Sequence, residues 1–419
     1  MRSSFDVTIV SAWFPPEPAP FGRMMFELAR HLGAQGMSVA VVTHVPNHPG
    51  GRVYGGYRNR LIQSEDVAPN VRVYRLGALP QWTIRGASAG FLHRLVGFVW
   101  FTIASSVVVL LSGRSRLLFA VLQPLSVAPF LVAIARLQGA KVVFNVQDLH
   151  PDAVIQAGLV RNGVLIAALR AIERFAYRRA NSLSVICQSF KQHCITRGAR
   201  PDEVAVIPNW IDLDEIRPQR HSSSLRREFT IREDSFVVLY AGTIGVVSGA
   251  EVLLEAAASL NGDDAVTTVF VGAGPLVPVL AAKAKTLPGT DVVFVPFQPR
   301  ERLGDVQALG DVCVVTLQAG HGRTSVPSKV LGYMAAGRPV IASVDDDSET
   351  ARLIHAAGAG WVVPPGNPAA LADAIREARR EVGQRQSCGD SGRLYLEKNL
   401  NQKVVLQQYA TLLHEVAGV

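Results

Sequence analysis

Short apolar, β-branched runs alternate with stretches of helical periodicity along the whole 419-residue chain. Each run ends in Gly, Pro or polar residues, which is typical of parallel strands joined by crossover helices. The alternation therefore predicts an α/β fold with parallel sheets. The expected strands are Val7–Val10, Val39–Thr43, Val71–Leu76, Leu117–Leu122, Lys141–Val146, Ser182–Cys187 and Val204–Ile207, then Phe236–Tyr240, Val266–Val271, Asp291–Val295, Val312–Leu317, Pro339–Ser343 and Gly360–Val363.

The predicted strands fall into two series, which indicates two domains of similar type. The series are separated by "IPNWIDLDEIRP" (207–218), which holds two prolines and shows no clean periodicity. We expect a first Rossmann-like domain over 1–207, a linker over 208–235, a second Rossmann-like domain over 236–395 and a C-terminal helix over 396–419. This helix could belong to the second domain or cross back to the first.

Ligands of open parallel sheets lie beyond the carboxyl ends of the strands. Because the linker is short, both domains are expected to present these ends to a common cleft.

Composition narrows the class of protein. The chain is 48% apolar and 18% charged, but its long uncharged apolar run, Leu95–Leu111, is shorter than the roughly 20 residues of a membrane-spanning helix. These values argue against a disordered chain and against a polytopic membrane protein. Four cysteines without metal-ligand or disulfide-framework spacing, and an N-terminus without an export signal, favour the cytoplasm.

Positive charge is concentrated in one segment. The formal net charge is +8, and Arg161–Arg200 holds eight Lys or Arg against one acid, Glu173. Such a segment is typical either of a solvated helix face or of a surface for an anionic partner, such as a membrane. The basic residues form no zinc-finger, RNA-binding or helix-turn-helix pattern, so we expect no nucleic-acid partner.

The apolar run Leu95–Leu111 allows two interpretations. His93 and Arg94 precede it, and Arg114 and Arg116 follow it. It is either a crossover helix buried on one sheet face or a monotopic helix half-inserted in a bilayer between its basic flanks. The sequence leaves both open.

The loop after the first predicted strand carries four prolines between Pro15 and Pro20. They predict that no helix begins before Gly22, and an amphipathic helix is expected to start by about Met24. A close backbone approach at Gly22, beside Arg23 and the free amides of the helix, could hold a phosphate. Gly22 could equally make only a tight turn.

Three titratable side chains follow the fifth predicted strand. "FNVQDLHPDA" places Asp148, His150 and Asp152 within five residues at a strand's carboxyl end. Such groups are candidates for acid, base or hydroxyl-binding roles. Asp148 and His150 are the stronger candidates, because Asp152 before Ala153 is better explained as the cap of the next helix.

Glycines punctuate the loops after the first two strands of the second half. "YAGTIGVVSGAE" carries Gly242, Gly245 and Gly249, which is not the dinucleotide spacing G-x-G-x-x-G, and "FVGAGP" adds Gly272 and Gly274. Together they predict a phosphate loop without a dinucleotide fingerprint.

A basic, hydroxyl-rich segment begins a later helix. "GRTSVPSKVLGYMAAGRPV" places Arg323, Ser325, Ser328 and Lys329 at a loop-to-helix start, where they and the helix amides could bind a diphosphate. The sequence has no P-loop, zincin or nucleophile-elbow motif, which removes P-loop NTPases, zincins and α/β hydrolases of ordinary pattern.

Taken in order, these motifs resemble the two-Rossmann-domain (GT-B) glycosyltransferases of family 4 over nearly the whole chain. The resemblance rests on the Pro-rich loop before "FGRMMFELARHL", then "DLHPD", "IERFAYRRANSLSVICQSF", "VAVIPNWID", "YAGTIG", "FVGAGP", "VPSKVLGYMAAGRPVIA" and "GWVVPPGNPAALADAI". "SVPSKVLGYMAAGRPV" and "DLHPD" are most similar to the bacterial branch that adds fucosyl or N-acetylfucosaminyl units in O-antigen and colanic-acid assembly.

The resemblance implies an acceptor-binding first domain and a donor-binding second domain. Asp148 and His150 would be catalytic, although the branch often has Trp at the position of His150. Gly22 and Arg23 would form an acceptor or phosphate loop, and Asn209 would lie at the cleft. The donor-binding residues would be Gly242, Thr243, Gly245, Gly272, Phe297, Arg323, Ser325, Pro327, Ser328 and Lys329.

Two departures from the family pattern bear on the donor site. Thr324 and Gly332 stand where the family commonly has two glutamates, the second of which contacts the nucleotide ribose. "VS" at 247–248 stands where the first glycine loop usually has a lysine. Neutralisation of the diphosphate would then fall to Arg323 and Lys329.

The enzyme implied is a retaining glycosyltransferase that needs no metal or cofactor. It would move a fucose-type or N-acetylated amino sugar from a UDP or GDP donor to a polyprenyl-diphosphate-linked saccharide at the inner face of the cytoplasmic membrane. The base would be recognised around Val295–Gln298. The alternative is a catalytically degenerate GT-B scaffold in a polysaccharide assembly complex, which would not bind a nucleoside diphosphate.

Overall fold

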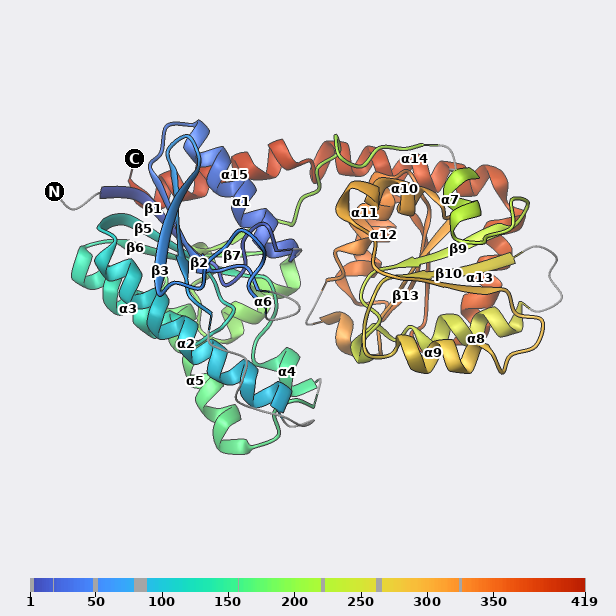
Figure 1. Ribbon diagram of the computed structural model, residues 1–419, viewed down its shortest axis with the longest axis horizontal. Coiled ribbons are helices and arrows are strands. Elements are labelled where there is room, and N and C mark those ends of the chain that lie inside the picture. The colour runs from blue at the N-terminus through green and yellow to red at the C-terminus, as the bar shows by residue number, and fades with distance from the viewer. Residues whose placement is uncertain are drawn as a thin grey trace. The chain divides into compact units, whose positions relative to one another are not determined.

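The computed structural model describes residues 4–17, 19–47, 52–78, 89–156, 158–219, 223–260, 266–323 and 326–418. They form two compact units (Figure 1). The first comprises Met1–Pro208 together with Leu406–Val419, and the second comprises Asn209–Val405.

An eight-stranded sheet forms the centre of the first unit. Its strand order is β3-β4-β2-β1-β5-β6-β7-β8, and every pair is parallel except β3 with β4. The strands are β1 (Ser4–Val10), β2 (Val39–His44), β3 (Ile62–Ala68), β4 (Val71–Leu76), β5 (Arg114–Val121), β6 (Lys141–Val146), β7 (Ser182–Val185) and β8 (Val204–Val206).

Helices cover both faces of this sheet. Figure 1 shows α2, α3 and α5 along one face, with α1 and α15 on the other. The last helix is fixed by Tyr409, whose hydroxyl accepts a hydrogen bond from Asn145 of β6 at 3.0 Å. No helix among the described residues is long and apolar enough to cross a membrane. The helices are α1 (Pro20–Ala34), α2 (Ala89–Leu111), α3 (Val127–Gln138), α4 (Asp152–Gln156), α5 (Gly163–Arg179), α6 (Gln188–Thr196), the 3-10 helix η1 (Pro201–Glu203) and α15 (Gln402–Ala417).

The second unit is built on a fully parallel six-stranded sheet. Its strand order is β11-β10-β9-β12-β13-β14, so β9 and β12 lie at the centre. All the carboxyl ends therefore lie at one edge of the sheet. The strands are β9 (Phe236–Ala241), β10 (Val266–Val271), β11 (Val292–Val295), β12 (Val312–Thr316), β13 (Val340–Ser343) and β14 (Gly360–Val363).

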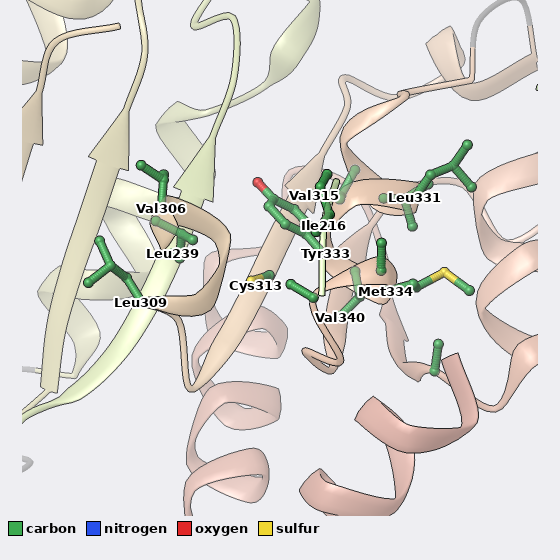
Figure 2. Close-up of a cluster of buried hydrophobic side chains, with 14 of the residues drawn as sticks. Ile216, Leu239, Val306, Leu309, Cys313, Val315, Leu331, Tyr333, Met334 and Val340 are labelled. Atoms are coloured by element: carbon green, nitrogen blue, oxygen red, sulfur yellow. The ribbon is translucent and has the colours of Figure 1, made fainter. Parts of the chain in front are cut away.

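The core of the second unit ties its helices to the central strands. Figure 2 shows Leu331, Tyr333 and Met334 of α11 packed against Cys313 and Val315 of β12. The helices are α7 (Ser223–Glu228), η2 (Val246–Ser248), α8 (Glu251–Ser259), α9 (Val277–Ala284), η3 (Arg300–Arg302), α10 (Leu303–Ala308), η4 (His321–Arg323), α11 (Lys329–Ala335), α12 (Glu349–Ala357), α13 (Pro368–Arg380) and α14 (Val382–Asn399), with η denoting 3-10 helices.

The predicted fold class is confirmed, because both sheets are parallel with crossover helices, apart from the antiparallel edge strand β3. The expected linker, 208–235, contains α7, and Leu225, Phe229 and Ile231 are buried in the core of the second unit. Most of that segment is thus an integral part of the second unit.

Two local features differ from the prediction. β3 was not expected, because its sequence "IQSEDVA" has no continuous apolar face and it pairs only at the sheet edge. The expectation that no helix begins before Gly22 was also wrong, because α1 begins at Pro20. Pro is favoured at the first helical position, where its missing N–H needs no partner.

Candidate functional site

Two glycine loops lie against each other at the carboxyl edge of the second sheet. The Gly242 N–H donates to the Val271 carbonyl at 2.9 Å, and the Ile244 N–H donates to the Ala273 carbonyl at 3.0 Å. A Cβ at Gly272 would overlap the Gly242 carbonyl, and one at Gly274 would overlap the Ile244 carbonyl. These glycines therefore let the loops after β9 and β10 meet backbone to backbone.

The first glycine loop is also joined to the end of β12. Gly245 precedes η2, and its carbonyl accepts a hydrogen bond from the Ser248 hydroxyl at 2.6 Å. The Ser248 carbonyl in turn accepts from the Thr316 hydroxyl at 2.5 Å. Ser248 thus links the loop after β9 to Thr316, the last residue of β12.

Lys329, the first residue of α11, lies directly beside this loop. A Cβ on Gly242, whose φ is +148°, would lie 3.1 Å from Lys329 Cε and 3.3 Å from its Nζ. The Lys329 ammonium lies 3.7 Å from the centre of the Tyr240 ring. Glycine at 242 therefore leaves room for the lysine to reach the strand end.

The Lys329 ammonium has no counter-charge in the described part of the chain. Burial lowers its pKa from 10.5 to about 7, and no carboxylate opposes this shift. A cationic group that is half-buried and unpaired binds an anion favourably, because the anion restores the stability of its charged form. The site can thus attract a phosphate group.

Two tyrosines that the sequence analysis missed hold the lysine and the loop in place. The Tyr333 hydroxyl accepts from the Ala241 N–H at 2.7 Å and donates to the Ala241 carbonyl at 3.1 Å. The Tyr240 hydroxyl donates to the Thr243 carbonyl at 2.9 Å. Tyr333 is four residues after Lys329, so the helical spacing i, i+4 is the signal that could have linked them.

The other predicted donor-site residues lie after β11 or between β12 and α11 in the chain. Phe297 follows β11 and is 64% exposed. Pro327 and Ser328 lie just before α11, and Ser328 forms no side-chain cap on it. Arg323 ends η4 and its side chain is not described, while Ser325 lies outside the described residues.

Helix α11 is only seven residues long, so its dipole is small. The expected contribution of helix amides to a diphosphate site is therefore weak. In a diphosphate site at this edge, the Lys329 ammonium would then be the main source of positive charge among the described side chains.

The departure at Gly332 has a structural counterpart. Gly332 is buried in α11, and the amide group of Gln307 occupies the space that a Cβ at 332 would enter. Gln307 is itself buried, and its Oε1 has no hydrogen-bond partner among the described residues. A larger side chain at 332 would therefore collide with the amide of Gln307 from α10.

Asp148 and His150 lie in the loop after β6 of the first unit. Burial lowers the pKa of His150, while Asp148 and Glu173 act in the opposite direction. His150 Nε2 is buried without a hydrogen-bond partner within the described ranges. A neutral imidazole of this kind can accept a proton.

The interpretation of Asp152 as a helix cap is wrong. Its carboxylate accepts hydrogen bonds from Arg170 at 3.4 Å and from Arg197 at 3.2 Å. Arg197 also lies 3.7 Å from the buried Glu173, which is 2.8 Å from His193. Asp152 therefore belongs to an ion-pair network that joins α4, α5 and the C-terminal end of α6.

Gly22 and Arg23 lie in the first turn of α1. A Cβ at Gly22 would come within 2.9 Å of the Phe14 nitrogen, so glycine is required for the helix to approach the loop after β1. Arg23 is ion-paired to Glu27 at 2.6 Å. The structure thus gives Gly22 a packing role and Arg23 an acidic partner.

Asn209 is the first residue of the second unit. Its Oδ1 is buried and has no hydrogen-bond partner in the part of the chain that is described. Its expected role at a cleft stays a prediction.

Two family models match the chain. "Glycosyl transferase 4-like domain" matches residues 21–210, and "Glycosyl transferases group 1" matches residues 235–380. WcaI of Escherichia coli K12, named as a colanic acid biosynthesis glycosyl transferase, is 26% identical over 404 residues, which cover 94% of this chain and 96% of WcaI.

Solved structures of the same architecture were also found. Sucrose-phosphate synthase from Thermosynechococcus elongatus superposes with a TM-score of 0.76 at 18% identity, over the full length of both chains. HepE of Anabaena in complex with UDP-glucose superposes with a TM-score of 0.69 at 16% identity, over 98% of this chain and all of HepE.

These likenesses and the two parallel sheets define a protein of the GT-B fold. The two family models together match most of the chain. The chain belongs to the family 4 glycosyltransferases.

Proposed function

We propose that this glycosyltransferase moves a sugar from a nucleotide-diphosphate donor to a polyprenyl-diphosphate-linked saccharide during synthesis of a bacterial surface polysaccharide. The sugar is of the fucose or N-acetylated amino-sugar type. The similarity to WcaI supports the pathway, and the UDP-glucose bound to HepE supports the class of donor.

The observation that carries the proposal is the unpaired Lys329 ammonium beside the Gly242 loop. In sugar transfer, negative charge develops on the departing diphosphate, and a fixed cation in a partly dehydrated site stabilises it. Arg323 is the second candidate for this role. The glycine loops after β9 and β10 bring backbone groups close to the same place.

The acceptor would be held by the first unit. Retention means that the acceptor oxygen bonds to the anomeric carbon on the face that the diphosphate leaves. The lowered pKa of His150 keeps it neutral near pH 7, so it can take up the hydroxyl proton, and Asp148 can orient the acceptor. The expectation that the enzyme works without a metal comes from the family resemblance alone.

The test is a thermal-shift screen with UDP, GDP, dTDP, ADP and CMP, followed by a transfer assay with the matching nucleotide sugar and lipid-linked acceptors. We expect saturable stabilisation by one diphosphate, which rises as the logarithm of its concentration. Binding without transfer to any lipid-linked acceptor would contradict the acceptor class. No binding to any of the five would favour the degenerate scaffold.

A further inference from the structure

Helix α2 exposes an apolar face, where a surface helix is expected to expose a polar one. Among the helix side chains that the structure describes, 96–111, every exposed one is apolar, while three polar ones are buried. The exposed side chains, each 42–62% accessible, are Val96, Val99, Ile103, Val107, Leu110 and Leu111. The buried polar side chains are Thr102, Ser105 and Ser106.

The buried polar groups are satisfied inside the protein. Thr102 Oγ1 donates to the Phe98 carbonyl, and Ser106 Oγ donates to the Thr102 carbonyl. The exposed residues recur at intervals of three and four, so they form one continuous stripe along the helix. The stripe therefore runs along the described side chains of the helix, 96–111.

The neighbouring helices also expose apolar side chains. α3 packs beside α2 and α5 packs beside α3 on the same sheet face (Figure 1). α3 exposes Phe130 and Leu137, and α5 exposes Val164, which is 81% accessible. We name the α2 stripe together with these three side chains the outer face.

The outer face lies in a part of the chain that is strongly basic. Residues 67–200 contain sixteen Lys or Arg and three Asp or Glu, and no acid occurs between Asp66 and Asp148. Of those three acids, Glu173 is fully buried and Asp152 is ion-paired. The outward charge is therefore almost entirely positive.

Five exposed arginines lie on the helices of the outer face or next to them: Arg114, Arg136, Arg161, Arg174 and Arg178. None has an ion-pair partner within the described residues. An apolar surface with basic residues around it matches the boundary region of an anionic bilayer, where acyl chains meet phosphate groups.

We propose that the outer face lies flat on an anionic lipid membrane, with α2 parallel to its plane. The apolar side chains enter the headgroup–acyl boundary and the arginines pair with lipid phosphates. A second copy of the chain fits less well, because a twofold contact would bring unpaired arginines on one copy against those on the other. This inference deepens the proposed function by naming the surface that brings the enzyme to a lipid-linked acceptor.

The first test is co-sedimentation of the full chain with phosphatidylcholine vesicles, with and without phosphatidylglycerol. We expect binding that requires the anionic lipid and falls with added salt. Ile103→Glu with Val107→Glu should lower the bound fraction at least tenfold. Val279→Glu on α9, another exposed valine, is the matched control and should bind as the wild type does.

The second test neutralises charge. Arg136→Gln with Arg174→Gln should weaken binding to anionic vesicles about 25-fold, since each basic group near such a surface accounts for about a fivefold change. Lys285→Gln with Lys398→Gln, both exposed in the second unit, is the control that should change nothing. Unchanged binding in the Arg136/Arg174 variant would overturn the proposal.

Nucleotide binding separates this inference from the proposed function. The outer-face variants should keep the thermal shift of the wild type with its nucleoside diphosphate, which also shows that they are folded. If Ile103→Glu with Val107→Glu instead converts a dimer to a monomer and leaves vesicle binding intact, the outer face joins two copies and the membrane assignment is wrong.

Discussion

Nucleoside diphosphate binding should depend on pH through Lys329. In the free protein its pKa is about 7, against an ordinary value of 10.5. A bound diphosphate stabilises the ammonium form and returns the pKa toward the ordinary value. The affinity is then highest below pH 7 and falls as the pH rises through the pKa of the free protein.

The magnitude follows from the fraction of protonated lysine. Between pH 6.5 and 8.5 a group with a pKa near 7 loses protonation about 25-fold, which corresponds to about 1.9 kcal/mol of binding free energy. Calorimetric titration across this range measures it. Lys329→Met removes the ammonium group and keeps a side chain of similar length. The pH dependence of binding to this variant therefore reports the ionisation of the ligand alone.

The lowered pKa of Lys329 also makes the stability of the protein depend on pH, and stability rises with pH where diphosphate affinity falls. Because folding lowers the pKa of Lys329, the folded wild type binds fewer protons than the unfolded chain between about pH 7 and 10.5. Its free energy of unfolding relative to Lys329→Met should then rise by up to about 1.4 kcal/mol per pH unit in that window. A ratio of wild-type to variant affinities that is constant from pH 6.5 to 8.5 would refute the reasoning.

Three further substitutions test the supporting structure. Gly272→Ala forces a Cβ into a backbone carbonyl at positive φ and should cost about 3 kcal/mol or more in urea unfolding, whereas Gly383→Ala in α14 has open space and should be neutral or stabilising. Tyr333→Phe leaves a strand-end amide unpaired; its expected cost is about 1–3 kcal/mol with weaker diphosphate binding, and unaltered binding would show that the loop does not need it. Glu173→Gln removes the buried carboxylate that pairs with Arg197 and His193, so thermal melts should show that the free energy of unfolding falls by about 3–5 kcal/mol. A fall below 1 kcal/mol would contradict a structural role.

The sequence predicted most of the fold because buried parallel strands leave a strong apolar signal. Val71–Leu76, Lys141–Val146 and Val266–Val271 were predicted with the observed boundaries. β3 gave no such signal, since an edge strand needs neither a buried face nor two partners. The α7 segment was read as linker because six helical residues are too few to show a period.

The candidate site was predictable as a set of residues and not as an arrangement. Gly242, Gly272 and Lys329 were selected from motif spacing, but their contacts depend on strand order, which brings β9, β10 and β12 together. The shifted pKa of Lys329 comes from burial beside the Tyr240 ring, which no local pattern encodes. Similarly, Asp152 has the sequence context of a cap, and only the fold places two arginines against it.

The most direct test of a donor site at Lys329 is calorimetric titration at pH 7 with the nucleoside diphosphate that the screen selects. Wild type, Lys329→Met and the surface control Lys285→Met are compared. We predict saturable one-site binding in the wild type and in Lys285→Met, and at least tenfold weaker binding in Lys329→Met. Equal affinities in all three proteins would contradict the assignment of the diphosphate to Lys329.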